Sequence, residues 1–233
     1  MKFNFSTKHI YTLHWDQLYW VRFEFQNSIE SLGNLAKNVS PNMTKDLKAI
    51  KDKCALEIKS LKESGEEDYA IHLENEFYEN IHYVLHPMTS LSYQSIFVTA
   101  YALLESNLKK LVEFTWKSVD AQPKQISKRD LVGSYSRELN SLSSVRAQDI
   151  AGYSEIQSLY KEVRNRFTHE MGYFEKDNKI IIEAEGVYEG LKIDIKSSTI
   201  SIVNEAFVLD FLRKCNSFYS KLIEDHDKAF HEG

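Results

Sequence analysis

Apolar side chains recur at steps of three and four residues along most of this sequence, and only three prolines interrupt the pattern. This spacing places apolar residues on one face of an α-helix. Pro41, Pro87 and Pro123 are each flanked by polar turn-forming residues, and proline normally begins or ends a helix. The 8 glycines and 3 prolines are too few for a sandwich or barrel of short strands. We therefore expect a mainly α fold, a helical bundle.

The apolar pattern also gives the approximate bounds of the helices. The segment that opens at Ser90 or Ser92 is the most apolar, so we expect it at the centre of the bundle. The N-terminal helices are expected to pair as a hairpin. The predicted helices are 9–37, 66–86, the apolar helix to Trp116, 128–142, 151–169, and a last one capped by Asn204. A further helix is predicted to begin at Thr44 and to end near Ser64 and Gly65.

The pattern changes near the C-terminal end of the chain, where short runs rich in β-branched residues appear. These runs are 179–183, 191–195 and 199–203, and turns are expected at Gly186 and Gly190. The sequence therefore predicts a small β-hairpin or meander inserted before the last helix.

The length of 233 residues, 42% of them hydrophobic, suits one large domain or two small ones. We expect residues 1–88 to form an N-terminal helical extension that packs on the core. Residues 89–233 are expected to form the main helical domain, and one continuous domain over 1–233 is the alternative.

Charge and cysteine content narrow the classes of partner. The net charge of −5 argues against a protein that coats nucleic acid, so any RNA binding must come from a local basic patch. Cys54 and Cys215 are far apart, and His82 and His86 lack a third ligand, so we expect no metal and no cofactor. Without an apolar run long enough for a secretory signal or a span, we expect a cytoplasmic protein with no membrane partner.

The most informative short stretch is EVRNRFTHEMGYF, residues 162–174. Asn165 and His169 are four positions apart and lie away from the predicted core stripe, with Arg164 on the flank of that stripe. An ideal helix separates Arg164 from His169 by about 140°. The two can act together only if the helix ends near His169 or another surface completes the site. The alternative is an ordinary solvated face, on which Lys161, Arg164 and Arg166 accompany Glu155, Glu162 and Glu170.

Residues 164–169, RNRFTH, resemble the R-x4-H signature of the HEPN superfamily of helical nucleases. The likeness covers about 90–228. It includes an apolar upstream helix with a glutamate, Glu105 in LLES, a motif helix, a short β insertion and a closing amphipathic helix. Some members of the family carry a tyrosine two places after the histidine, which a partner nucleotidyltransferase modifies. Met171 stands at that position here, so silencing of that kind is not expected.

The resemblance implies a metal-independent endoribonuclease in which the ribose 2′-OH attacks the adjacent phosphate. The products would be a 2′,3′-cyclic phosphate and a 5′-OH. Arg164 would stabilise the charged phosphorane, because guanidinium stays charged and can fork onto two oxygens. His169 would transfer protons, since a free histidine side chain changes charge near neutral pH, with a pKa of about 6.5. Asn165 would orient His169 or bond the phosphate, and Glu105 would hold Arg164.

One histidine cannot easily serve as both acid and base, and the resemblance implies a homodimer that brings two motifs together. The expected partners are RNA and a second copy, with an antitoxin or a defence-system protein as a further candidate in a toxin or antiphage role. The alternatives are a non-catalytic module that binds RNA, nucleotide or a protein, and a helical interaction protein with no site. A basic rim would comprise Arg166, Lys161, Lys109 and Lys110, with Lys124, Lys128 and Arg129 as further members.

Overall fold

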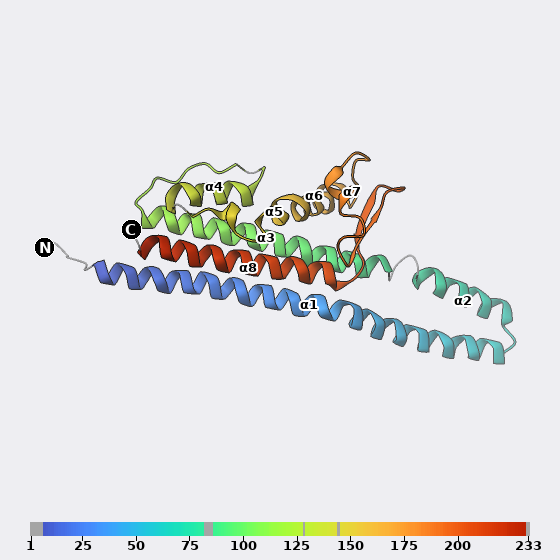
Figure 1. Cartoon of the computed structure of the whole chain (residues 1–233). Helices are drawn as coiled ribbons and strands as arrows, with labels where there is room; N and C mark the ends of the chain where they lie inside the picture. The colour runs from blue at the N-terminus through green and yellow to red at the C-terminus, as the bar shows by residue number, and fades with distance from the viewer. Residues whose placement is uncertain (1–6, 82–85, 128, 144, 232–233) are drawn as a thin grey trace.

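The computed structural model shows three long helices lying side by side, with shorter elements covering one side of them (Figure 1). The long helices are α1 (Thr7–Glu63), α3 (His86–Ser118) and α8 (Glu205–His231). The prediction of a mainly α bundle is confirmed. The structure describes residues 7–81, 86–127, 129–143 and 145–231, with side chains left out at 7–16, 80, 86, 230 and 231.

The shorter elements follow α1 and α3 along the chain. Helix α2 folds back along the far end of α1, and the others cover the side of α3 opposite α1 (Figure 1). They are α2 (Glu67–Asn80), α4 (Leu131–Ser143), a 3-10 turn (Ala147–Asp149), α5 (Tyr153–Glu155), a π turn (Ile156–Tyr160), α6 (Lys161–Glu170), α7 (Lys179–Glu183), β1 (Leu191–Asp194) and β2 (Thr199–Ile202).

Helix α3 lies at the centre of the core, as its apolar sequence predicts. It packs on α8, since the Phe97 and Phe211 rings lie 4.8 Å apart and the Tyr219 hydroxyl donates to the Asn107 carbonyl at 3.1 Å, and it also contacts α1. The first half of α1 belongs to the same core, because the Phe25 ring lies 4.3 Å from that of Tyr219. Among the described residues, no helix is long and apolar enough to cross a membrane.

The prediction that a helix ends at Pro41 is wrong, because α1 continues through it. Pro41 is exposed, so water can reach the carbonyl that loses its usual amide partner. On the N-terminal side Val39 is buried in the core, and on the other side α1 packs against α2, so contacts on both sides hold the helix. Thr44 does not cap a helix; its hydroxyl donates to the Ser40 carbonyl at 2.9 Å inside α1. The turn at Ser64 and Gly65 is confirmed, since Gly65 has a φ of 84°.

The boundary at Pro87 also differs from the prediction. Helix α3 begins at His86, so Pro87 lies in its first turn, where a missing N–H costs nothing. Ser90 and Ser92 are therefore inside the helix, and the Ser92 hydroxyl donates to the Met88 carbonyl at 2.9 Å. The predicted helix over 66–86 matches α2 up to Asn80, and residues 82–85 lie outside the described part.

The predicted β segment is confirmed for two of its three runs. Strands β1 and β2 form an antiparallel hairpin in which Leu191 pairs with Ile202. Residues 179–183 form the short helix α7 instead of a strand, because the Asn178 side chain caps it by accepting from the Ile181 N–H at 3.2 Å. Local capping here overrides the strand preference of three consecutive isoleucines. The expected cap of the last helix is present, as Asn204 accepts from the Ala206 N–H at 2.9 Å.

Candidate functional site

Arg164 and Glu105, which lie on α6 and α3, meet in an ion pair. The Arg164 Nη2 atom donates to both carboxylate oxygens of Glu105, at 3.2 and 3.1 Å. The Nη1 atom donates to the Asn165 side-chain oxygen at 3.1 Å. The side chains of Arg164 and Glu105 are only 24% and 13% exposed. Three of the four residues that sequence reasoning singled out for catalysis are therefore joined in one cluster.

An aromatic ring supports this cluster from within the bundle. The Arg164 guanidinium carbon lies 5.4 Å from the centroid of the Tyr101 ring, a cation–π distance. Tyr101 is almost fully buried and stacks on Phe211, with centroids 5.7 Å apart and planes 7° apart. Burial raises the pKa of the Tyr101 hydroxyl, so this residue stays neutral. The guanidinium is thus held by a carboxylate, an amide and a rigid ring face.

Burial raises the pKa of the Glu105 carboxyl, and the charge and hydrogen bonds of Arg164 only partly offset that shift. The negative charge of nearby Asp130 raises the pKa further. The carboxylate is therefore less favourable here than in water, even beside a guanidinium. A second anion placed on Arg164 would increase this penalty and favour protonation of Glu105.

His169 lies in the last turn of α6 and is exposed. Helix α6 ends directly after it, because Met171 has a φ of 52° and the Gly172 N–H donates to the Arg166 carbonyl at 3.0 Å. A side chain at Gly172 would come within 2.8 Å of the Ile200 carbonyl, so β2 fixes this helix end. The condition that the helix must end near His169 is met. Within the described residues His169 makes no hydrogen bond or ion pair, which suits an accessible proton-transfer group.

The motif helix as a whole is less regular than the prediction of a helix over 151–169. It begins after Gly152, whose φ is 88°, and contains the π turn Ile156–Tyr160 before α6. A π turn inserts an extra residue and shifts the direction in which the side chains on either side of it point. Ile156 and Val163 are both fully buried, so the helix keeps its core contacts on both sides of the turn.

Four members of the expected basic rim, Arg166, Lys161, Lys109 and Lys110, are each paired with carboxylates. Arg166 is only 12% exposed and pairs with Glu162, Glu170 and Glu175. The remaining three form one pair each, with nitrogen-to-oxygen distances of 3.2 to 3.7 Å: Lys161 with Asp130, Lys109 with Glu113, and Lys110 with Glu24. The side chain of Lys109 is 59% exposed and that of Lys110 is 50% exposed. Among these four residues they are the most exposed, and so the best placed to contact an anion.

Sequence reasoning missed Asp130, which lies just before α4. Its carboxylate accepts from the Gly133 N–H at 3.3 Å and pairs with Lys161 and Arg137. The signal was present, because an aspartate directly before an apolar periodic run is a typical helix N-cap. Asp130 links α4 to α6 and adds a negative charge near Glu105.

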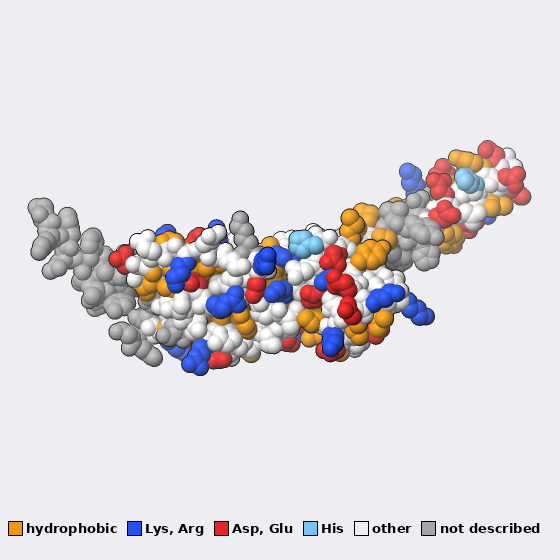
Figure 2. All heavy atoms as spheres, turned by 90° about the horizontal axis from the view of Figure 1, so that it is seen from above, with side chains coloured by type: hydrophobic (Ala, Val, Ile, Leu, Met, Phe, Trp, Pro, Cys, Tyr) orange, Lys and Arg blue, Asp and Glu red, His pale blue; other side chains and the backbone are white. Residues whose placement is uncertain are grey.

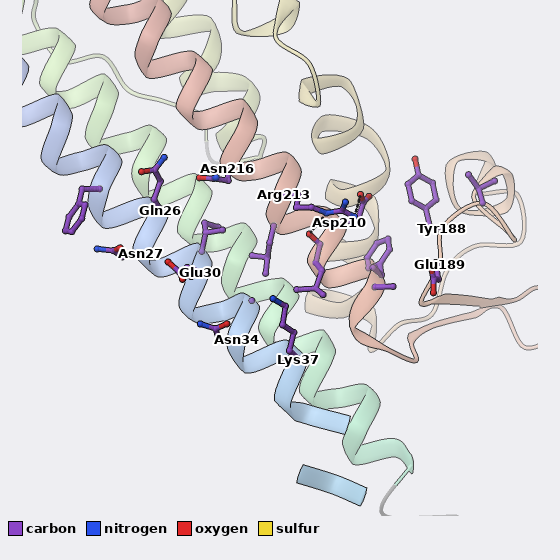
Figure 3. A pocket seen from close by; sticks show the side chains of 18 residues that line it. Gln26, Asn27, Glu30, Asn34, Lys37, Tyr188, Glu189, Asp210, Arg213 and Asn216 are labelled. Carbon is purple, nitrogen blue, oxygen red and sulfur yellow. Dashed lines mark hydrogen bonds and ion pairs between the residues drawn. The ribbon is translucent and has the colours of Figure 1, made fainter. Parts of the chain in front are cut away.

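The largest described cavity lies elsewhere, between α1, α8 and residues 187–189 (Figure 3). Its volume is about 1060 Å³, and amide side chains such as Asn27, Asn34 and Asn216 line it. None of the three described cavities is lined by Arg164, His169 or Glu105. The candidate site lies outside these three cavities, with the His169 side chain exposed.

In the described part of the chain, no group of three or more His, Cys, Asp or Glu side chains is arranged to hold a metal ion. The side chains of His82 and His86, which the sequence argued against as metal ligands, lie outside the described part. No known family, curated protein or solved structure matches this chain, so the candidate site rests on its own geometry and chemistry.

Proposed function

We propose that this chain is a metal-independent endoribonuclease that resembles HEPN ribonucleases and acts as a homodimer, in a toxin or antiphage-defence role. The observation that carries the proposal is the Glu105–Arg164–Asn165 cluster one helical turn or so before the exposed His169 at a fixed helix end. This cluster holds a guanidinium in place, and the helix end leaves an imidazole free to reach substrate.

The reaction requires one bond to form and one to break at phosphorus. The ribose 2′-oxygen attacks the phosphate as a base removes its proton, and the 5′-oxygen leaves as an acid protonates it. The Arg164 guanidinium would bind the non-bridging oxygens, whose negative charge increases in the transition state. His169 of each copy would supply one of the two proton transfers. Because burial already raises the pKa of Glu105, a bound phosphate would further favour its protonation, weaken its hold on Arg164 and leave the guanidinium available to the substrate.

We expect RNA cleavage to survive EDTA, because every group that the reaction needs is a protein side chain. The measurement is incubation of the purified protein with total RNA in EDTA, followed by analysis of the new ends. The expected ends are 2′,3′-cyclic phosphates and 5′-hydroxyls. Cleavage that appears only when Mg²⁺ or Mn²⁺ is added back would contradict this mechanism.

We expect a two-fold symmetric dimer whose interface includes the outer face of α6 near Asn165 and His169. The reason is that His169 is exposed and, within the described residues, is the one histidine of the motif helix. A C2 axis near His169 would bring the same patch of both copies together. The measurement is light scattering at micromolar concentration together with a structure of the assembly. A monomer in scattering, with no symmetric contact at α6, would exclude this arrangement.

The non-catalytic binding module remains the second candidate, and one observation favours it. Arg164 is held inside its own fold by Glu105, as a purely structural arginine would be. The two proposals differ in the RNA-end assay, since a module would bind RNA, nucleotide or protein without producing new ends.

A further inference from the structure

Residues 42–80 form an arm, made of the last part of α1 and all of α2, that projects beyond the rest of the molecule (Figures 1 and 2). Its two helices contact each other. The side of each helix that carries partly buried side chains, Ile58 on α1 and Phe77 on α2, is taken as the seam between them. Ala70 is the single buried residue among the described side chains of the arm. A two-helix arm of this kind has almost no core of its own.

The arm also exposes large hydrophobic side chains. Exposed apolar groups gathered on one element are typical of an interaction surface. The exposed fractions are 47% for Ile50, 71% for Leu56, 55% for Tyr69, 54% for Ile71 and 60% for Tyr78. A partner that covers part of this surface would supply the core that the arm lacks.

The two helices of the arm carry opposite charge. Helix α2 has five acidic residues and no lysine or arginine, whereas residues 45–62 of α1 have six lysines and three acidic residues. Lys59 pairs with Glu63 at 3.8 Å within α1, and among the described residues no ion pair joins α1 to α2. A surface with one basic and one acidic half is complementary to a second copy of itself.

Helical geometry places the charges and the apolar groups on the same face. We count about 100° per residue from the seam, looking down each helix from its N-terminal end. By this count Lys51 and Lys62 lie on the clockwise flank of α1, and Ile71 and Tyr78 lie on the clockwise flank of α2. In an antiparallel pair these two flanks form one face. Glu67 and Glu74 also lie on that flank of α2, by the same count. We call this face, defined by these six residues, the charged face.

We propose that the charged face is a dimerisation surface, on which the arms of two copies pack into an antiparallel four-helix bundle. In this bundle α1 of one copy lies over α2 of the other, so basic and acidic helices meet. Ile71 and Tyr78 become covered at the same time. The proposal rests on the arm alone and holds whether or not the protein cleaves RNA.

The charges also fix the direction of the two-fold axis. An axis across the arms would place α1 on α1 and bring lysines against lysines. An axis parallel to the arms places α1 on α2 at the same height, which brings Lys62 close to Glu67 of the other copy and Lys51 within about one helical turn of its Glu74. Both arms then point the same way, with the two bodies at the same end of the assembly.

Cysteine cross-linking in the full chain tests this arrangement independently of any contact at α6. Two copies that differ in tag size are co-expressed, one with Lys62→Cys and one with Glu67→Cys, both carrying Cys54→Ser. Cys215 is fully buried and will not react. A short bismaleimide should join the two sizes at least about tenfold faster than in a matched pair, Lys53→Cys with Glu76→Cys, since binding raises effective concentration. That control pair lies on the opposite face of the arm.

Charge-reversal variants provide a second test. Lys51→Glu in both copies should lower the cross-linking yield several-fold, and adding Glu74→Lys to both should restore it, whereas Lys53→Glu should change nothing. Circular dichroism of each variant confirms that helix content is kept. Equal yields from the two cysteine pairs, or a Lys51→Glu variant that cross-links like the parent, would overturn the proposal. RNA cleavage measured on the same samples would be unaffected by that outcome.

Discussion

Replacing His169 with alanine will abolish RNA cleavage and leave the fold intact. His169 is exposed in the last turn of α6, where truncation removes little packing. The free energy of unfolding should stay within about 0.5 kcal/mol of the parent, as exposed substitutions usually do. The cleavage rate should fall by roughly 10²–10⁴-fold, the typical contribution of a general acid–base group. The measurement is cleavage of the same RNA by both proteins, with melting temperature recorded alongside.

The matched control for this variant is His72→Ala, because His72 is also an exposed helical histidine but lies in the arm. It should cleave RNA at the parent rate. Equal cleavage by His169→Ala and the parent would point to a contaminating nuclease or to a different site. The endoribonuclease proposal would then give way to the binding module.

The central helix and the hairpin were predictable because each depends on a strong local pattern. Residues of α3 such as Phe97 and Leu104 repeat at helical steps and are fully buried. The runs that became β1 and β2 alternate apolar and polar residues, and one face of each is covered by the bundle. Where the apolar periodicity matches the burial in the structure, the sequence alone is enough to predict the helix or strand.

The errors fall where a tertiary contact or a single cap decides the outcome. Pro41 does not end α1, since the core holds the helix before it and α2 holds the helix after it. Asn178 starts a helix in a run of isoleucines that favours a strand. A proline or a β-branched run indicates only a local preference. It carries no information about contacts with residues distant in the sequence.

The candidate site shows the same division. The position of His169 near a helix end follows from Gly172, three residues beyond it, and the sequence indicates that end. The contact of Arg164 with Glu105 spans 59 positions, and only the resemblance suggested it. Its role in positioning a phosphate stays a prediction. The π turn before α6 has no signature in the residues Ile156–Tyr160 that we can identify.

Replacing Arg164 with alanine should remove cleavage and also destabilise the protein. The substitution leaves the partly buried Glu105 carboxylate without its partner, and an unsatisfied buried group of this kind costs about 1–3 kcal/mol. Arg164→Lys should recover part of that stability and little activity, because lysine keeps the charge and loses the fork that grips two phosphate oxygens. The measurements are denaturant unfolding and RNA cleavage on the same preparations.

A double substitution separates the structural role of Arg164 from its catalytic one. Adding Glu105→Gln to Arg164→Ala removes the stranded carboxylate, whose pKa burial already raises, so stability should partly return. Cleavage should not return, because no guanidinium is left to meet the phosphorane. If stability and cleavage instead recovered together, Arg164 would act only by holding α6 against α3. Loss of cleavage in a protein whose stability is restored is the result that assigns the guanidinium to the substrate.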